Sequence, residues 1–312
     1  MKKNLTIATF ISNNEQFNND VIEIVKYLKR DYCVELIVFS NKLILDYDKN
    51  VKQIISDNTT KYKRIIKLIE ISKNNNILCL DNDITTNKVN LKKFIDYCFT
   101  VDYSIAWGKI KSIKLDNFVS HLVAIDKNLS HDYIRPFLWK MNVGISLPGQ
   151  IFMINKKYYI EKFSIVDTVY DDLAIGITTK KYNMPVYFTK DILGYETPKV
   201  SFKELIKQRK RWSNGFAQII YNNRNSRMEK YVLLHGFMYH LLWIPFYIIL
   251  ILLFFVNLIL SLIYLLVFSI ILSRKKFIDI FWSFIYIIIF PFVHIIWFVY
   301  FNINLIKQYS NN

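Results

Sequence analysis

The sequence contains little glycine: seven residues in 312, and none before Gly108. A glycine-rich phosphate loop of the dinucleotide-binding or P-loop kind is therefore absent from the first third of the chain, and any nucleotide must be held differently. Cysteine is also scarce. Cys33, Cys79 and Cys98 are far apart and form no Cys-x-x-Cys pair, which argues against a zinc site or a disulfide framework and favours a reducing, cytoplasmic setting.

Charge is almost absent from the end of the chain. Residues 231–312 hold four basic residues and one acidic residue, whereas residues 1–230 hold 37 of the 41 basic and 24 of the 25 acidic side chains and carry about +13. We predict a soluble domain over residues 1–230 and a membrane region over residues 231–303. The positive charge of the first domain favours anionic lipid headgroups, nucleotide phosphates or nucleic acid, and does not choose among them.

The apolar region is long enough for several membrane crossings. No formal charge lies between Lys230 and Arg274, which leaves room for two crossings of about twenty residues each. We expect three transmembrane helices, at about 232–252, 255–273 and 277–301. If residues 1–230 are cytoplasmic, a hairpin returns Arg274-Lys275-Lys276 to the cytoplasm, as the positive-inside tendency requires. The predicted location is the plasma membrane, with multiple crossings and with residues 1–230 in the cytoplasm.

Strands and helices alternate in the first domain. Residues 5–11, 34–39 and 77–80 have the composition of buried strands, and apolar residues recur at helical spacing in 21–28 and 59–72. Alternation of this kind predicts an α/β fold with a largely parallel sheet covered on both faces.

Two acidic pairs are placed where such a fold binds ligands. Asp81-Asn82-Asp83 directly follows the 77–80 strand, at the carboxyl end where open α/β sheets bind their ligands, and two carboxylates there suit a divalent cation. The alternative is a polar turn that caps the next helix. Asp171-Asp172 follows Gly149-Gln150 and a strand-like run. It indicates either a general base, whose pKa is raised by its acidic neighbour, or a helix N-cap.

A basic segment precedes the apolar region. Ser201 and Glu204 form a capping box, so an interfacial helix is expected near 201–220. It carries the sequence Gln208-Arg209-Lys210-Arg211-Trp212. Arginine can hold a diphosphate by bidentate hydrogen bonds, and tryptophan offers a flat apolar face to a sugar. The alternative is a basic helix on the membrane surface with Trp212 as an interfacial anchor.

Together these motifs resemble a known family. The chain resembles the glycosyltransferase family 2 enzymes with a GT-A fold, particularly membrane synthases related to cellulose, chitin and hyaluronan synthases. The resemblance covers roughly residues 4–220. It rests on the order of Asn14-Glu15, Asp81-Asn82-Asp83, Gly149-Gln150, Asp171-Asp172 and Gln208–Trp212, the last matching Q-x-x-R-W.

The resemblance implies a GT-A (Rossmann-like) domain followed by transmembrane helices. It also implies an inverting, Mg²⁺- or Mn²⁺-dependent transfer from a nucleotide-diphospho-sugar, with a UDP-sugar as first choice. Its site residues fall into four groups. They are Asp172 as base with Asp171 beside it; Asp83 with Asp81 at the metal; Asp81, Gln208, Arg209, Arg211 and Glu15 at the donor; and Trp212, Gly149 and Gln150 at the acceptor.

One segment departs from the family pattern. Phe39-Ser40-Asn41-Lys42 stands where the family usually has an acidic segment that contacts the base or ribose, so donor identity stays open. The acceptor is a growing glycan or, in a single addition, a lipid-linked molecule. Membrane lipids are expected partners, and a homo-oligomer or an export partner could complete a polysaccharide channel.

Two other classes of function are weighed against the transferase. A nucleic-acid or anionic-surface binding protein would explain the charge but neither the acidic pairs nor the apolar crossings, so no nucleic-acid partner is expected. A catalytically inactive membrane scaffold would lack metal-dependent donor turnover.

Overall fold

A computed structural model describes residues 2–11, 16–43, 51–56, 59–113, 117–163, 168–273 and 277–310. The chain forms two compact units. The sheet unit comprises Met1–Lys111 and Ile145–Thr197, and the helical unit comprises Ser112–Gly144 and Pro198–Asn312. The boundary predicted at residue 230 marks a change in composition and stays a prediction. The chain passes from one compact unit to the other after Lys111, Gly144 and Thr197.

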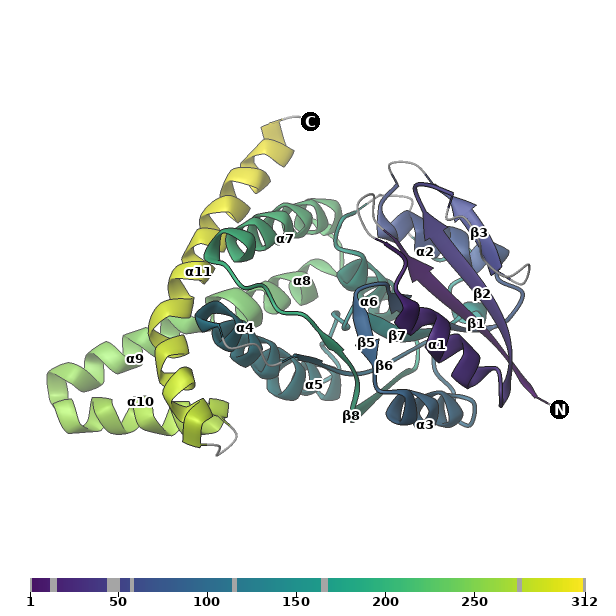
Figure 1. The fold of residues 1–312 in the computed structure, drawn as a ribbon. Coiled ribbons are helices and arrows are strands. Elements are labelled where there is room, and N and C mark those ends of the chain that lie inside the picture. Colours follow the sequence, from purple (N-terminus) through teal and green to yellow (C-terminus); the bar gives the residue numbers. More distant parts are fainter. Residues whose placement is uncertain are drawn as a thin grey trace. The chain divides into compact units, whose positions relative to one another are not determined.

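The sheet has the strand order β3-β2-β1-β4-β7-β6-β8-β5 (Figure 1). The strands are β1 Lys3–Phe10, β2 Tyr32–Ser40, β3 Val51–Ile55, β4 Asn76–Asp81, β5 Ile84–Thr86, β6 Ile105–Ser112, β7 Ile151–Asn155 and β8 Val186–Glu196. Strands β3, β2, β1 and β4 pair in parallel, but β7 is antiparallel to both β4 and β6, and β5 is antiparallel to β8. The sheet is therefore mixed, and the prediction of a largely parallel sheet was wrong. Hydrophobic patterning shows which residues are buried but does not specify strand direction.

Three of the four α-helices described in the sheet unit follow a residue whose side chain caps them. The four are α1 Asn19–Leu28, α2 Lys61–Ile71, α3 Lys88–Cys98 and α6 Asp171–Lys181, with a short 3-10 helix η2 at Lys156–Tyr158. Asn18, Thr60 and Asn87 each accept a backbone N–H from the first turn of the following helix. The predicted helices at 21–28 and 59–72 are confirmed.

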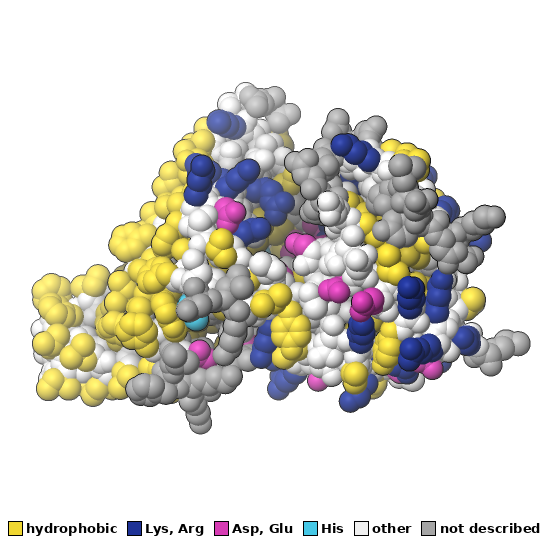
Figure 2. Space-filling view, viewed as in Figure 1, with side chains coloured by type: hydrophobic (Ala, Val, Ile, Leu, Met, Phe, Trp, Pro, Cys, Tyr) yellow, Lys and Arg dark blue, Asp and Glu magenta, His cyan; other side chains and the backbone are white. Residues whose placement is uncertain are grey.

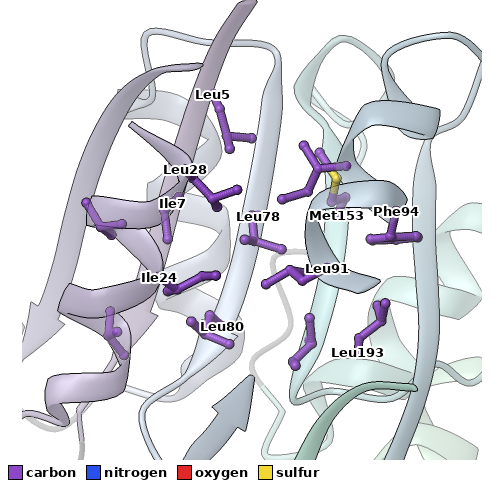
Figure 3. Close-up of a cluster of buried hydrophobic side chains, with 14 of the residues drawn as sticks. Leu5, Ile7, Ile24, Leu28, Leu78, Leu80, Leu91, Phe94, Met153 and Leu193 are labelled. Carbon is purple, nitrogen blue, oxygen red and sulfur yellow. The ribbon is translucent and has the colours of Figure 1, made fainter. Parts of the chain in front are cut away.

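The core of the sheet unit lies between β4 and the helices α1 and α3. Figure 3 shows Ile24 and Leu28 of α1 in one cluster with Leu78 and Leu80 of β4. Leu91 of α3 extends the same cluster. All five side chains are fully buried. Truncating one of them to alanine would cost about 2–5 kcal/mol, so this layer fixes the strand that ends at Asp81.

The helical unit combines the end of the chain with residues 117–140. Its elements are α4 Phe118–Asn128, π-helix η1 Leu129–Ile134, α5 Arg135–Lys140, α7 Phe202–Asn223, α8 Glu229–Gly236, π-helix η3 Phe237–Leu241, α9 Trp243–Val256, α10 Leu258–Ser273 and α11 Phe277–Ser310. Leu122 of α4 and Leu205 of α7 share a core with Tyr286 and Phe290 of α11. The predicted start of α7 is confirmed, because the Ser201 hydroxyl accepts the Glu204 N–H.

The prediction of three membrane crossings is not supported. Among the described residues, one helix, Asp279–Ser310, is long and apolar enough to cross a membrane. The segments Glu229–Leu241 and Trp243–Val256 pass the same test only together, and they are bent by 45°. Helix α10 has 16 residues, which span about 24 Å against a hydrocarbon core of about 30 Å. An uncharged run cannot reveal where its helices break. Residues 274–276, which were expected to return to the cytoplasm, lie outside the described residues.

Candidate active site

The D-x-D segment occupies the carboxyl end of β4. Asp81 is the last residue of β4, and Asn82 and Asp83 form the turn that leads into β5. The Asp81 N–H donates to the Gln150 carbonyl oxygen at 2.8 Å, which joins this turn to the start of β7. The Asp83 side chain is exposed. The segment does not cap the following helix, because Asn87 caps α3.

Asn82 holds the turn in place. Its side chain is 4% exposed, donates to the Gln16 carbonyl at 2.8 Å and accepts the Asn18 N–H at 2.9 Å. The Asn18 amide in turn donates to the Asn82 carbonyl at 2.9 Å. The middle residue of D-x-D is thus held by the residues that lead into α1, which fixes the backbone of the turn between Asp81 and Asp83.

The second acidic pair lies in the first turn of α6. Asp171 and Asp172 are the first two helical residues, and the N-cap, Tyr170, makes no side-chain capping bond. Asp172 Oδ1 accepts the Leu173 N–H at 2.9 Å. Two carboxylates at a helix N-terminus are stabilised by its dipole. The pair is therefore within the helix rather than at its N-cap.

Two glycines let the backbone approach this helix closely. A Cβ at Gly176 would lie 1.9 Å from the Ile145 carbonyl oxygen, so only glycine lets α6 pack against that backbone. A Cβ at Gly149 would lie 3.3 Å from the Asp172 Cβ, which places Gly149 against the acidic pair. The segment 145–150 therefore positions the start of α6 beside the end of β4.

Lys61 brings the two acidic pairs together. Its Nζ lies 2.6 Å from Asp81 Oδ1 and 3.4 Å from Asp171 Oδ2, and it donates to the Gly149 carbonyl at 2.7 Å. The three charged side chains are 16–25% exposed. We call these residues, Lys61, Asp81 and Asp171, the acidic cluster. Sequence analysis missed Lys61, because one lysine among 41 basic residues gives no signal by itself.

The acidic cluster carries unbalanced charge. Burial alone would lower the pKa of Lys61, but the carboxylates of Asp171 and Asp81 outweigh it and raise that pKa above its usual range. Burial raises the pKa of Asp81 to about 7, against the lowering effect of Lys61. One ammonium faces two carboxylates, with exposed Asp83 two residues from Asp81. The cluster therefore favours a cation.

Gln150 and Glu196 connect the start of β7, next to the acidic cluster, to strands β8 and β5 at one edge of the sheet. Gln150 Nε2 donates to Glu196 Oε2 at 2.8 Å. Glu196, at the end of β8, pairs in register with Ile84, the residue after Asp83. Glu196 is a second residue that sequence analysis missed, because the pairing of β5 with β8 joins segments about 110 residues apart.

The residues present fit a hard divalent cation that is shared with a ligand. Among the described residues, no group of three His, Cys, Asp or Glu side chains could hold a metal alone. Mg²⁺ is usually held by one or two carboxylates, with water and substrate phosphates completing its shell. Asp81 and Asp83 offer that donor set, and Asp171 Oδ2 is buried without a hydrogen-bond partner. Glu15 lies outside the described residues.

The Gln208–Trp212 segment is placed on α7 in the helical unit. Arg209 is 4% exposed, and its guanidinium donates to Asp126 Oδ2 of α4 at 2.6 Å. The same guanidinium lies 4.4 Å from the Trp212 ring centroid. Asp126 Oδ1 accepts the Tyr286 hydroxyl of α11 at 2.9 Å. Arg209 is thus held inside the helical unit by an acid that sequence analysis did not single out.

Arg211 lies on another side of α7. Residues two positions apart do not share a helix face, and Arg211 is exposed where Arg209 is buried. Gln208 and Trp212 are half-buried. The predicted diphosphate role of Gln208, Arg209 and Arg211 and the predicted acceptor role of Trp212 stay predictions, as does the alternative of a basic helix at a membrane surface.

The chain is similar in fold to solved glycosyltransferases. A mannosyltransferase from Pyrobaculum calidifontis, solved with GDP-Man and Mn²⁺, superposes with a TM-score of 0.53 at 12% identity over 96% of this chain and 87% of that one. Glucosyl-3-phosphoglycerate synthase from Mycobacterium tuberculosis, solved with phosphoglyceric acid, gives a TM-score of 0.49 at 12% identity over 70% and 79%. The fold is the mixed α/β fold of GT-A glycosyltransferases.

Comparison of sequences gives the family. No curated protein matches the chain. Residues 77–305, more than two thirds of the chain, match the glycosyl transferase family group 2, and this range contains the D-x-D turn, the acidic pair of α6 and the Gln208–Trp212 segment. The chain therefore belongs to glycosyl transferase family group 2 and is a glycosyltransferase.

Proposed function

We propose that the protein transfers a sugar, with inversion, from a nucleotide-diphospho-sugar to a hydroxyl of a growing glycan, in a reaction that requires a divalent metal. The observation that carries this proposal is the acidic cluster, in which Lys61 joins Asp81 of β4 to Asp171 of α6 next to exposed Asp83. Its excess negative charge at a strand end suits a metal-bound diphosphate. A UDP-sugar is the proposed donor.

The donor half of the site consists of Asp81, Asp83 and Lys61. Asp81 and Asp83 would hold Mg²⁺ or Mn²⁺, which neutralises the charge of the departing diphosphate. Solved proteins of this fold are complexed with Mn²⁺ or Mg²⁺. The Lys61 ammonium contacts both the Asp81 and the Asp171 carboxylates and so holds the end of β4 beside the start of α6. Glu15 is assigned to the donor by the family resemblance alone.

The acceptor half is assigned to Asp172, Gly149 and Gln150. The acceptor hydroxyl oxygen forms a bond to the anomeric carbon while the bond from that carbon to the diphosphate oxygen breaks, and Asp172 takes the hydroxyl proton. One base is sufficient for direct displacement, and the sugar inverts. Asp171 is held near Lys61, so it is the less suitable proton acceptor of the pair.

The Gln208–Trp212 segment completes the proposed assignment. Its roles rest on the family resemblance: Gln208 and Arg211 at the diphosphate, and Trp212 at the acceptor. Arg209 could join them only by giving up the 2.6 Å contact with Asp126. We therefore propose that Arg211 is the main guanidinium at the leaving group.

A second candidate is a single transfer to a lipid-linked acceptor. One specific observation favours it: by length and composition, a single described helix could cross a membrane, or two if the bent pair is one span. So few helices would not enclose a polysaccharide channel within one chain. Polymer extension would then need a homo-oligomer or an export partner.

The test is turnover of a panel of UDP- and GDP-sugars by the purified protein in lipid vesicles, with products identified by mass. We expect transfer that depends on Mg²⁺ or Mn²⁺ and is abolished by Asp83→Ala. Asp191→Ala removes another exposed aspartate of the sheet unit, on β8, and should leave turnover intact. Undiminished transfer in Asp83→Ala, or in wild type treated with a chelator, would refute the metal assignment.

A further inference from the structure

Helices α9 and α10 expose many large apolar side chains. Figure 2 shows hydrophobic side chains covering the hairpin that these two helices form. At its apex, Phe255 is 80% and Val256 is 77% exposed. No formal charge occurs from Tyr231 to Ser273. A continuous apolar surface of this kind marks an interaction site.

The exposure extends around α9 instead of following one stripe. Ile248, Ile249, Ile251 and Leu252 are each about half exposed, and these positions point in several directions around the helix axis. In α9 only Phe246 is buried. A folded partner or a second copy would cover one face, whereas a hydrocarbon solvent covers all of them.

Helix α10 mainly buries polar residues and exposes apolar ones, which is the reverse of a helix in a soluble protein. Three of its four buried residues are serines, Ser261, Ser269 and Ser273, while leucine and isoleucine side chains are exposed. Each serine hydroxyl donates to a carbonyl of its own helix, at 2.7–2.9 Å. Small residues at helix contacts and apolar residues outside are the pattern of helices packed in lipid.

Each helix of the hairpin, taken alone, is too short to cross a bilayer. The two helices have 14 and 16 residues, about 21 Å and 24 Å long, and a hydrocarbon core is about 30 Å thick. The chain reverses at Asn257, whose backbone is extended. The Asn257 N–H donates to the Leu253 carbonyl, and its side chain accepts the Ile259 N–H, both at 2.8 Å. The turn therefore satisfies polar groups internally, as hydrocarbon requires.

We propose that α9 and α10 form a re-entrant hairpin, which enters the hydrocarbon layer of a lipid bilayer and returns to the same side. Phe255 and Val256 lie at its deepest point. Exposed Arg224, Arg227 and Lys230 precede the hairpin, and the sequence Arg274-Lys275-Lys276 follows it. Basic residues on both flanks match anionic headgroups on one side of the membrane. The inference does not depend on the sugar donor or acceptor.

The test measures how deeply the apex of the hairpin enters a lipid bilayer, with a fluorophore attached at the apex. Cys33, the exposed cysteine, is replaced by serine; Cys79 and Cys98 are buried. Phe255→Cys is labelled with an environment-sensitive fluorophore in vesicles of phosphatidylcholine and phosphatidylglycerol. These vesicles carry spin-labelled lipids with the quencher either near the headgroup or near the end of the acyl chain. Val256→Cys repeats the measurement at a neighbouring position, should the first variant fold poorly.

We expect the apex label to lose most fluorescence to the deep quencher. A label at Ile244→Cys, in the first turn of α9, should lose most to the shallow one. Val89→Cys is the matched control, because Val89 is 56% exposed on α3 of the sheet unit and should be quenched by neither. If the apex is quenched best by a headgroup label and reacts with an impermeant reagent on the far side, the hairpin spans the bilayer. If it behaves like Val89, lipid is not its partner. Either result overturns the inference.

Discussion

Each unit has a partly buried ion cluster among its described residues, and the two clusters differ in charge balance. In the sheet unit, the Lys61 ammonium faces the carboxylates of Asp81 and Asp171. In the helical unit, the Arg209 guanidinium faces one carboxylate, Asp126, whose other oxygen accepts a hydrogen bond from Tyr286. Both clusters join segments that are distant in the chain.

We infer that this difference separates the proposed ligand site from a packing contact. In the helical cluster, one guanidinium balances one carboxylate, and each oxygen of that carboxylate has a hydrogen-bond partner. These bonds connect α4, α7 and α11. The balanced pair does not favour binding of a further ion. The acidic cluster retains negative charge at the end of a central strand, next to exposed Asp83. Burial makes uncompensated negative charge energetically costly. We therefore infer that a bound cation completes the acidic cluster.

The largest effect is expected from a substitution that removes the proposed base, Asp172, without changing the shape of the side chain. Asp172→Asn keeps nearly the same size and hydrogen bonding but cannot accept a proton, so turnover should fall by roughly 10²–10⁴ while donor affinity survives. Asp171→Asn should reduce turnover less. Initial rates and donor binding, measured on the same preparations, check this. Greater sensitivity at Asp171 would mean that the roles of the pair are reversed.

Removing the acid of the helical cluster should affect stability instead of chemistry. Asp126→Ala leaves the buried Arg209 guanidinium without its carboxylate, which should cost about 3 kcal/mol of unfolding free energy, the low end for buried pairs because Asp126 is 21% exposed. Thermal unfolding in detergent checks this.

The control for the helical cluster is a matched change on the same helix. His121→Ala removes a half-buried side chain from α4 that stacks on Trp282, with ring centroids 4.3 Å apart, and it should have the smaller effect because it leaves the ion pair of Arg209 and Asp126 in place. If Asp126→Ala unfolds like wild type but no longer binds donor, the cluster belongs to the active site and the distinction between the two units fails.

The pH dependence of metal binding sharpens the comparison. Burial raises the pKa of Asp81 to about 7, so a proton competes with the cation below neutrality and affinity should rise with pH. Between pH 6 and pH 8 the ionised fraction increases about tenfold, and Mg²⁺ affinity in the presence of UDP should increase about equally. Lys61→Met removes an interaction that lowers this pKa, so the rise should move to higher pH. A flat profile would place the cation elsewhere.

Sequence patterns located the polar ends of elements well. Asp81 through Asp83 lie at the carboxyl end of β4, Asp171 lies at the start of α6, and Ser201 caps α7, because strand ends and helix caps are local features. Strand direction, by contrast, depends on tertiary pairing. The antiparallel course of β7 and the pairing of Glu196 with Ile84 are therefore not visible in hydrophobic patterns.

Residues that act across long separations were missed for the same reason. Lys61 reaches Asp171, 110 positions later, and Asp126 reaches Arg209, 83 positions later. Neither contact leaves a mark in local sequence.

The chain breaks at Asn257, within the turn region that Asn257 and Ser261 predict, although the predicted helix bounds at residues 252 and 255 differ from it by a few residues because apolar residues continue on both sides. Two of the three predicted crossings were inferred from the uncharged run around it and are not supported by the helix lengths. Asp279–Ser310, which overlaps the third, is long and apolar enough to cross a membrane.

The central claim is that the unbalanced acidic cluster is a metal-dependent donor site. The most direct measurement is calorimetric titration of UDP into the purified protein with and without Mn²⁺, for wild type and for Asp83→Asn. We predict that wild type binds UDP only when Mn²⁺ is present and that Asp83→Asn, correctly folded, loses this metal-dependent binding. UDP binding of equal strength without metal, or unchanged metal-dependent binding in Asp83→Asn, would contradict the claim.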